Sequence, residues 1–234
     1  MIFKQYSFKR QSGSNNSLHY ELLLPYSKEN TDKALAFFKE AEEKGNKESS
    51  FHVKCLAKSY SNKMRFLEEE AKIGNIEAQY LLGKQLRAIR KNSVLLNGMN
   101  DDAAKEWFEK AANKGHIPAQ FELGYLYYTH RKRERDNEKA FIWLNKAATA
   151  GYPLAQIKLA DFYICGWAVK KDLKEAFDLY YKAALKGYDE AMYEVGQRYH
   201  KGIGVEQDLN KAIEWYKKSN YLYAEWALKD IGIK

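Results

Sequence analysis

Cysteine and proline are both scarce in this sequence, which has two cysteines and three prolines among 234 residues. Cys55 and Cys165 lie 110 positions apart, so the chain has neither a disulfide framework nor a four-ligand zinc site. Disorder is also disfavoured, because 45% of the residues are hydrophobic and can bury a substantial core. We therefore expect a folded protein of a reducing compartment, the cytoplasm.

Long apolar runs are missing too. Lysines and an arginine interrupt the first ten residues, MIFKQYSFKR, where a signal peptide needs an unbroken apolar stretch. The longest aliphatic run nearby is only Leu22 to Leu24. We expect neither secretion nor a membrane span.

The formal charge is +8, and its distribution along the chain matters more than its total. Residues 51–100 hold +5 of this excess, whereas the other stretches are nearly neutral. A local excess of this kind is usually a solvated helix face. Nucleic acid is therefore not the expected partner.

A repeat of 36 residues organises the second half of the chain. Two sets of landmarks recur at this spacing: Trp107, Trp143, Leu179 and Trp215, and Gly115, Gly151 and Gly187. The unit that begins at Ala78 is longer, with 41 residues, and its five additional residues lie before Trp107, near AIRKNSVLLNGMN. We predict that this insertion belongs to a loop. Such periodicity is typical of repeat proteins.

Each unit is predicted to form two helices, since apolar residues recur at three- and four-residue intervals in both halves. Three glycines stand in the middle of first helices, where glycine costs about 1 kcal/mol relative to alanine, so we expect close helix packing there: Gly83, Gly124 and Gly196. Four others follow second helices, where a left-handed residue can end the helix: Gly74, Gly115, Gly151 and Gly187.

The last complete unit, AMYEVGQRYHKGIGVEQDLNKAIEWYKKS, resembles the Sel-one-like repeat, a relative of the tetratricopeptide repeat. The family landmarks stand at Ala191, Gly196, Tyr199, Gly202, Gly204, Val205, Asp208, Lys211 and Ala212. The unit from Ala155 has Ala168 in place of the second turn glycine, and the unit from Ala119 replaces the whole turn with THRKRER. The resemblance implies an all-α fold, a right-handed α-solenoid superhelix of antiparallel helix pairs.

The resemblance divides the chain into four regions. Residues 78–219 form the repeats, with boundaries at 78–118, 119–154, 155–190 and 191–219. Residues 31–77 are divergent, shortened repeats, in which 56–78 is interpreted as a short helix pair and 31–45 as an isolated second helix. Residues 1–30 are irregular, and their LHYELLL segment is either a short helix or a strand. Residues 220–234 are predicted to form a C-terminal capping helix, because the last unit of an array has no neighbour.

No recognisable catalytic motif occurs, because G-x-S-x-G, H-E-x-x-H and the phosphate-binding G-x-x-x-x-G-K are all absent. His52 and Cys55 are three residues apart, but no second pair accompanies them. The acidic runs Asp101–Asp102 and Glu68–Glu70 are interpreted as helix starts, where negative charge favours the macrodipole. We therefore predict no catalytic residue, metal or cofactor.

Two basic segments are candidate contacts for an acidic partner. The run from Arg131 to Arg135 stands in the loop of one unit, where nearby carboxylates partly neutralise it. A second set shares one helix face: Lys84, Arg87, Arg90 and Lys91. Because the first helix of each pair is expected to line the concave wall, this second set is the stronger candidate.

The predicted partner-binding strip lies at the third, seventh and tenth positions of successive first helices. Its members are Tyr80, Lys84 and Arg87, then Phe121, Tyr125 and Tyr128, then Ile157, Asp161 and Ile164, and then Tyr193, Gln197 and His200. An exposed mixture of aromatic and charged groups is typical of protein interfaces. The alternative is a tightly wound superhelix that packs these rings against neighbouring first helices.

The resemblance implies a non-catalytic scaffold or adaptor that binds a partner protein in its concave groove. The basic and aromatic groups favour a partner that presents acidic and apolar groups. The alternative is a bacterial immunity protein that occludes a cognate toxin. Some relatives are linked to cell-wall chemistry, but these pair cysteines within each repeat and this chain does not, so a hydrolase is disfavoured.

Overall fold

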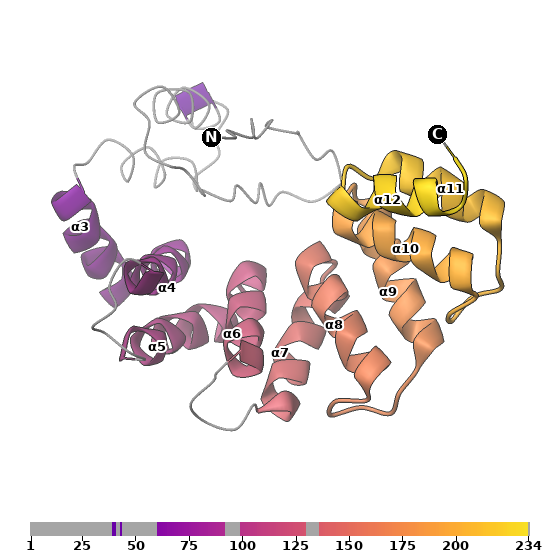
Figure 1. Cartoon of the computed structure of the whole chain (residues 1–234). Helices are drawn as coiled ribbons and strands as arrows, with labels where there is room; N and C mark the ends of the chain where they lie inside the picture. The colour runs from indigo at the N-terminus through magenta and orange to yellow at the C-terminus, as the bar shows by residue number, and fades with distance from the viewer. Residues whose placement is uncertain (1–38, 41–42, 44–59, 92–98, 130–135, 234) are drawn as a thin grey trace. The chain divides into compact units, whose positions relative to one another are not determined.

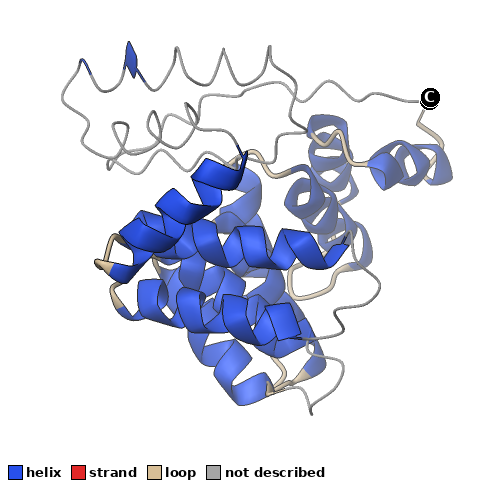
Figure 2. Ribbon diagram, turned by 90° about the vertical axis from the view of Figure 1, so that its left-hand side faces the viewer, coloured by secondary structure: helices blue, strands red, loops and turns tan. Residues whose placement is uncertain are grey.

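The structure is a computed structural model that describes residues 39–40, 43, 60–91, 99–129 and 136–233. The chain divides into two compact units, residues 1–63 and 64–234, and helices α3 to α12 belong to the second unit apart from the first turn of α3. Helices and the turns between them make up all of the described part (Figure 2). The prediction of an all-α fold is confirmed.

The described helices follow one another in a single row (Figure 1). They are α3 (Tyr60–Lys72), α4 (Ile76–Lys91), α5 (Met99–Asn113), α6 (Ile117–Thr129), α7 (Asn137–Thr149), α8 (Pro153–Cys165), α9 (Leu173–Leu185), α10 (Asp189–Lys201), α11 (Leu209–Lys218) and α12 (Leu222–Asp230). The closest packing joins α4 to α5, α6 to α7, α8 to α9 and α10 to α11, and each pair also contacts the next. The predicted solenoid of helix pairs is therefore present.

First and second helices take different sides of this row. In Figure 1, α4, α6 and α8 lie on its inner side and α5, α7 and α9 on its outer side. Helix α10 has the equivalent place in the repeat. We call the inward faces of α4, α6, α8 and α10 the inner wall.

The core between the helices depends on small side chains. The paired alanines of the second helices are all buried: Ala111, Ala112, Ala147, Ala148, Ala183 and Ala184. The mid-helix glycines mark the closest contacts, because a Cβ on Gly83 would meet the Phe108 ring at 2.7 Å and one on Gly196 would meet the Tyr216 ring at 2.6 Å. The predicted reason for these glycines, close helix packing, is confirmed.

The turns between repeats use glycine with positive φ. Gly74, Gly115, Gly151 and Gly187 have φ values of 98°, 86°, 85° and 85°, in the left-handed region predicted for them. Gly151 also accepts a hydrogen bond from the Lys186 ammonium of the next repeat through its carbonyl. This turn therefore ends one helix pair and contacts the next pair.

A buried glutamine after the first alanine of three repeats ties each first helix to the helix before it. The side-chain amides of Gln79, Gln120 and Gln156 donate to the backbone carbonyls eight residues earlier, at 3.0, 3.3 and 3.2 Å. In the last repeat this position is Met192. The sequence repeats Ala-Gln at these sites, but periodicity alone did not assign the amide a role.

The insertion in the first complete repeat lengthens helices, contrary to the prediction of a loop. Helix α4 has 16 residues where α6 has 13, and α5 has 15 where α7 has 13. These three and two additional helical residues account for the five inserted residues. The physical reason is that Ile89, Arg90 and Lys91 are adequate helix formers, so the helical hydrogen-bond ladder simply continues.

Two other predictions in the N-terminal half are corrected. Residues 60–72 form one continuous helix, α3, where a short helix pair was predicted, and Glu68–Glu70 lie in its second half instead of at its start. Asp101 and Asp102 do occupy the first turn of α5. Of the predicted helix at 31–45, only Lys39, Glu40 and Glu43 are described, and all three are helical.

The chain's last described helix, α12, packs on the final repeat as predicted for a terminal helix. Ala224 is buried against Tyr216, and Leu228 and Ile231 pack on the same cluster. Its other face remains open, because Leu222, Tyr223 and Trp226 are 68%, 52% and 71% exposed. The helix therefore covers the last repeat and presents a new apolar surface of its own.

Candidate functional site

Three of the four third-position residues of the predicted strip are not on the surface. Tyr80, Phe121 and Ile157 are only 8%, 9% and 1% exposed. Tyr80 lies against the His116 ring at 4.7 Å and Phe121 against the Tyr152 ring at 5.3 Å, measured between centroids. His116 and Tyr152 stand in the turns that follow the second helices α5 and α7, so these turns help to cover the first-helix rings, and the predicted exposure is corrected.

The seventh- and tenth-position residues, together with Tyr193, keep part of their surface exposed on the first helices. All are partly exposed: Lys84, Arg87, Tyr125, Tyr128, Asp161, Ile164, Tyr193, Gln197 and His200. They come from four consecutive first helices, so one wall carries both rings and charges. We call these nine the inner-wall residues.

At the N-terminal end of the wall, the predicted basic group is already paired. Arg87 donates a short hydrogen bond to the carboxylate of Glu122 on α6, and its guanidinium carbon lies 5.7 Å from the Tyr125 ring centroid. The Lys84 ammonium lies 5.5 Å from the Tyr80 ring centroid. Sequence reasoning missed Glu122, because this partner comes from the next repeat. The wall here is less basic than the sequence suggests.

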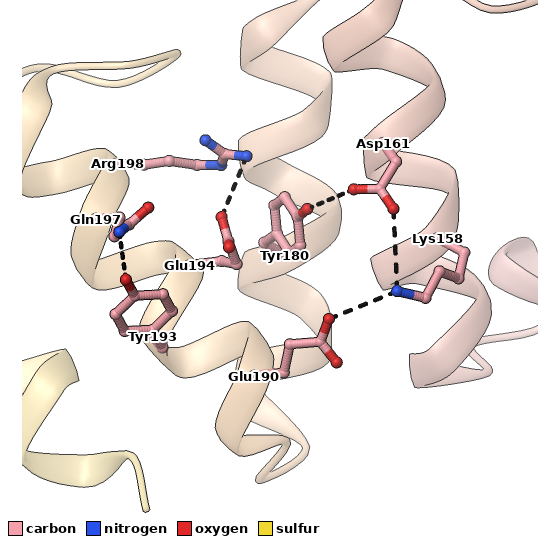
Figure 3. A network of polar contacts seen from close by, with 8 residues as sticks. All are labelled: Lys158, Asp161, Tyr180, Glu190, Tyr193, Glu194, Gln197 and Arg198. Carbon is pink, nitrogen blue, oxygen red and sulfur yellow. Dashed lines mark hydrogen bonds and ion pairs between the residues drawn. The ribbon is translucent and has the colours of Figure 1, made fainter. Parts of the chain in front are cut away.

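A polar network occupies the wall between α8, α9 and α10 (Figure 3). The Lys158 ammonium lies 3.5 Å from the Glu190 carboxylate and 4.0 Å from that of Asp161. The Tyr180 hydroxyl of α9 donates to Asp161 at 2.9 Å. Of these four residues, the sequence singled out only Asp161. The network joins three consecutive helices through side chains that stand 19 to 32 positions apart.

Arg198 is the most buried charged group of this network, with 7% of its surface exposed. Its guanidinium stacks 4.6 Å from the Tyr180 ring centroid and lies 3.5 Å from the Glu194 carboxylate. Among the described residues, its Nε atom has no hydrogen-bond partner. The cation is therefore held by a ring and one carboxylate.

Burial changes the protonation equilibria of the two inner carboxyls. Desolvation raises the pKa of Asp161 above its usual range, against the opposing effects of Lys158 and of the Tyr180 hydrogen bond. Desolvation likewise raises the pKa of Glu194, and the nearby Arg198 offsets this only in part. Burial disfavours the charged Lys158, but Glu190 and Asp161 outweigh it and raise the pKa of that amine. Burial therefore makes both carboxyls easier to protonate, while the neighbouring carboxylates favour the charged form of Lys158.

At the C-terminal end of the wall, tyrosines gather around Tyr193. Its ring lies 5.3 Å from Tyr221 and 6.1 Å from Tyr223, and these two rings are 5.6 Å apart. Gln197 donates a short hydrogen bond to the Tyr193 hydroxyl. The wall thus continues from α10 onto the start of α12.

The described residues include no group of three His, Cys, Asp or Glu side chains arranged to hold a metal ion. Cys165 is a free, exposed thiol. No helix in the described part is both long and apolar enough to cross a membrane. The His52–Cys55 pair, the basic run 131–135 and the LHYELLL segment lie outside the described residues, as do the side chains of Arg90 and Lys91.

The fold and the inner wall define a class of protein, the helical-repeat solenoid. The family model of the Sel1 repeat matches residues 17–46, 76–116, 117–152, 153–188 and 189–222. These matches cover well over half of the sequence, so the chain belongs to the Sel1 repeat family. Proteins of this family are protein-interaction scaffolds. The match at 17–46 begins within the N-terminal segment that sequence analysis left irregular.

Solved structures agree with this assignment. A protective antigen of uropathogenic Escherichia coli with an SLR fold is 30% identical with a TM-score of 0.64, and the match covers 73% of this chain and 37% of the antigen. A Sel1 repeat protein from Oxalobacter formigenes is 28% identical with a TM-score of 0.63, covering 74% of this chain and 70% of that protein. The chain thus spans little more than a third of the antigen's length. No curated protein sequence matches.

Proposed function

We propose that this protein is a non-catalytic scaffold that binds one partner protein along its inner wall. The observation that carries the proposal is the continuous row of partly exposed rings and charges on α4, α6, α8 and α10. Consecutive repeats present these groups on one surface, which suits an extended contact with another chain. Tyrosine and arginine are the residue types in which interfaces concentrate binding energy.

Tyr125 is the central anchor of this proposal. It stands between the Arg87 guanidinium and the ring of Tyr128, whose centroid is 6.2 Å away. Tyr128 in turn contacts Trp167 at 5.7 Å, so the rings support one another from α6 to the turn after α8. A ring held in this way loses little conformational entropy when a partner covers it.

The test begins with a photo-crosslinking amino acid placed at Tyr125 and, as a control, at Lys217 on α11, whose side chain is exposed. Crosslinked partners are identified by mass spectrometry and then purified. We expect a partner that crosslinks from position 125 and not from position 217. Equal crosslinking from both positions would argue against a wall-specific contact.

Calorimetry with the purified partner then measures the contribution of the wall. Tyr125→Ala should weaken binding about 30-fold, the effect of truncating an interface hot spot. Arg87→Gln, which keeps a hydrogen-bond donor toward Glu122, should mainly slow association and reduce its salt dependence. Unchanged affinity in both variants, with circular dichroism confirming the fold, would move the binding site away from the inner wall.

The identity of the partner separates an adaptor from an immunity protein. If the partner is a toxin, adding this protein should abolish its activity in an assay with purified components, and Tyr125→Ala should restore that activity. A partner without toxicity makes the protein an adaptor. In both cases the partner would bind the inner wall.

A further inference from the structure

The C-terminal end of the inner wall carries an aromatic and acidic patch that the proposed function does not yet use. We define this patch as Tyr193, Tyr221, Tyr223, Trp226, Glu190 and Glu194. The three tyrosine rings lie within 6.1 Å of one another, and Trp226 stands one helical turn after Tyr223. Trp226 and Tyr223 are 71% and 52% exposed, so the outer part of the patch is open to solvent.

The carboxylates lie beside these rings. Glu190 and Glu194 stand on either side of Tyr193 within about one turn of α10 (Figure 3). Their negative charges add to the effect of burial in raising the pKa of Tyr221. Glu190 is the more accessible of the two, since 42% of its side chain is exposed, against 26% for Glu194. Rings and carboxylates therefore meet on one surface.

Charge along the wall changes sign from one end to the other. Helices α8, α10 and α12 together carry six acidic and four basic side chains, a formal charge of −2 in a chain of +8. Helix α4 carries four basic residues and one acidic residue. The helices at the C-terminal end of the wall are therefore acidic on balance, whereas α4 is basic on balance.

We propose that this patch binds a segment of a partner protein that carries a lysine or arginine beside an apolar side chain. The cation lies over a tyrosine ring and pairs with the exposed part of Glu190, a carboxylate that also contacts Lys158 at 3.5 Å, and the apolar side chain covers Trp226. The sequence alone predicts an acidic partner, because the basic residues of α4 are the charged group that stands out in it. This inference rests on the proposed function and adds that the other end of the wall selects for positive charge.

A selection from a random peptide library displayed on phage, with the full chain as bait, tests the proposal without a known partner. Selected peptides should contain lysine or arginine within a few residues of an aromatic or aliphatic residue. For purified peptides, Trp226→Ala should weaken binding at least tenfold and Glu190→Gln about three- to tenfold, as expected for an anchor and a partly exposed charge.

Glu214→Gln is the matched control. Glu214 lies exposed on α11, and its replacement removes the same charge as Glu190→Gln. This variant should bind the selected peptides within about twofold of the parent, because a distant exposed charge contributes little. Circular dichroism checks that each variant retains its helices.

The remaining outcomes overturn the proposal and distinguish it from the proposed function. Acidic peptides that respond to Arg87→Gln, and not to Glu190→Gln, would refute the cation site while supporting the wall. Peptides insensitive to Trp226→Ala, Glu190→Gln and Tyr125→Ala alike would refute both. Concentration-dependent dimers that Trp226→Ala abolishes in analytical ultracentrifugation would assign the patch to a second copy of this chain. Failure to select any peptide would show that the patch recognises no linear basic segment.

Discussion

Gly124 on α6 lies directly against Leu144 on α7. A Cβ atom at position 124 would stand 2.9 Å from Leu144 Cγ and 3.0 Å from its backbone nitrogen. The contact thus involves the backbone of α7 as well as a side chain, so neither helix can move aside without separating the pair. This close contact lies in the helix pair that carries Tyr125.

This contact predicts a large effect of a small substitution. Gly124→Leu should destabilise the protein by several kcal/mol, because overpacking outweighs the gain of about 1 kcal/mol in helix propensity. Asn145→Leu, on the exposed face of α7, is the control and should change stability by less than about 0.5 kcal/mol. Urea denaturation measures both. A Gly124→Leu variant as stable as the parent would show that the helices are further apart.

A second prediction concerns the start of α9. The Asp172 carboxylate accepts hydrogen bonds from the backbone N–H groups of Lys174 and Glu175, both at 3.0 Å. Asp172→Ala should therefore cost about 1 kcal/mol of stability, and Asp172→Asn only a few tenths. Thermal and urea unfolding distinguish the two. Equal losses in both variants would mean that the charge, and not the cap, matters.

Asp161 predicts how the free energy of unfolding changes with pH. Its pKa is raised in the folded state by burial, so between the ordinary value of 3.8 and that raised value the folded protein binds more protons than the unfolded chain. The charged carboxylate therefore lowers stability above this window, and the penalty disappears as the pH falls through it. Asp161→Asn keeps an acceptor for Tyr180 and removes the titration.

Measuring the free energy of unfolding at pH 7 and pH 3.5 tests this sign. The stability of Asp161→Asn relative to the parent should be more favourable at pH 7 than at pH 3.5. A difference that is constant, or that changes in the opposite direction, would contradict the raised pKa.

The cysteines provide a prediction about redox chemistry. Cys165 is the last residue of α8 and is exposed, so its thiol should react rapidly with a thiol reagent in the native protein. Cys165→Ser should change stability by less than about 0.5 kcal/mol, since the side chain is not part of the core. We also expect two free thiols in freshly isolated, denatured protein. Finding one disulfide would overturn the expectation of a reducing compartment.

Much of the architecture follows from local patterns. The 36-residue spacing, the apolar intervals and the small residues are properties of individual helices and turns, so helix pairs, turn glycines and close contacts at Gly83, Gly124 and Gly196 were all predictable. The same reasoning predicted that Tyr125, Tyr128 and Asp161 are accessible, and all three are partly exposed.

Only the tertiary structure decided which of those faces remain open. Tertiary packing buries Tyr80, Phe121 and Ile157, the first two partly against rings in the turns that follow the second helices, and no helical periodicity predicts this cover. It also brings Glu122 to Arg87 and Glu190 to Lys158, and each of these contacts joins two different helix pairs. Amino-acid spacing determines what a single helix presents, whereas the packing of one repeat on the next determines what it covers. The sign and the accessibility of charge on the inner wall therefore depend on the assembled solenoid.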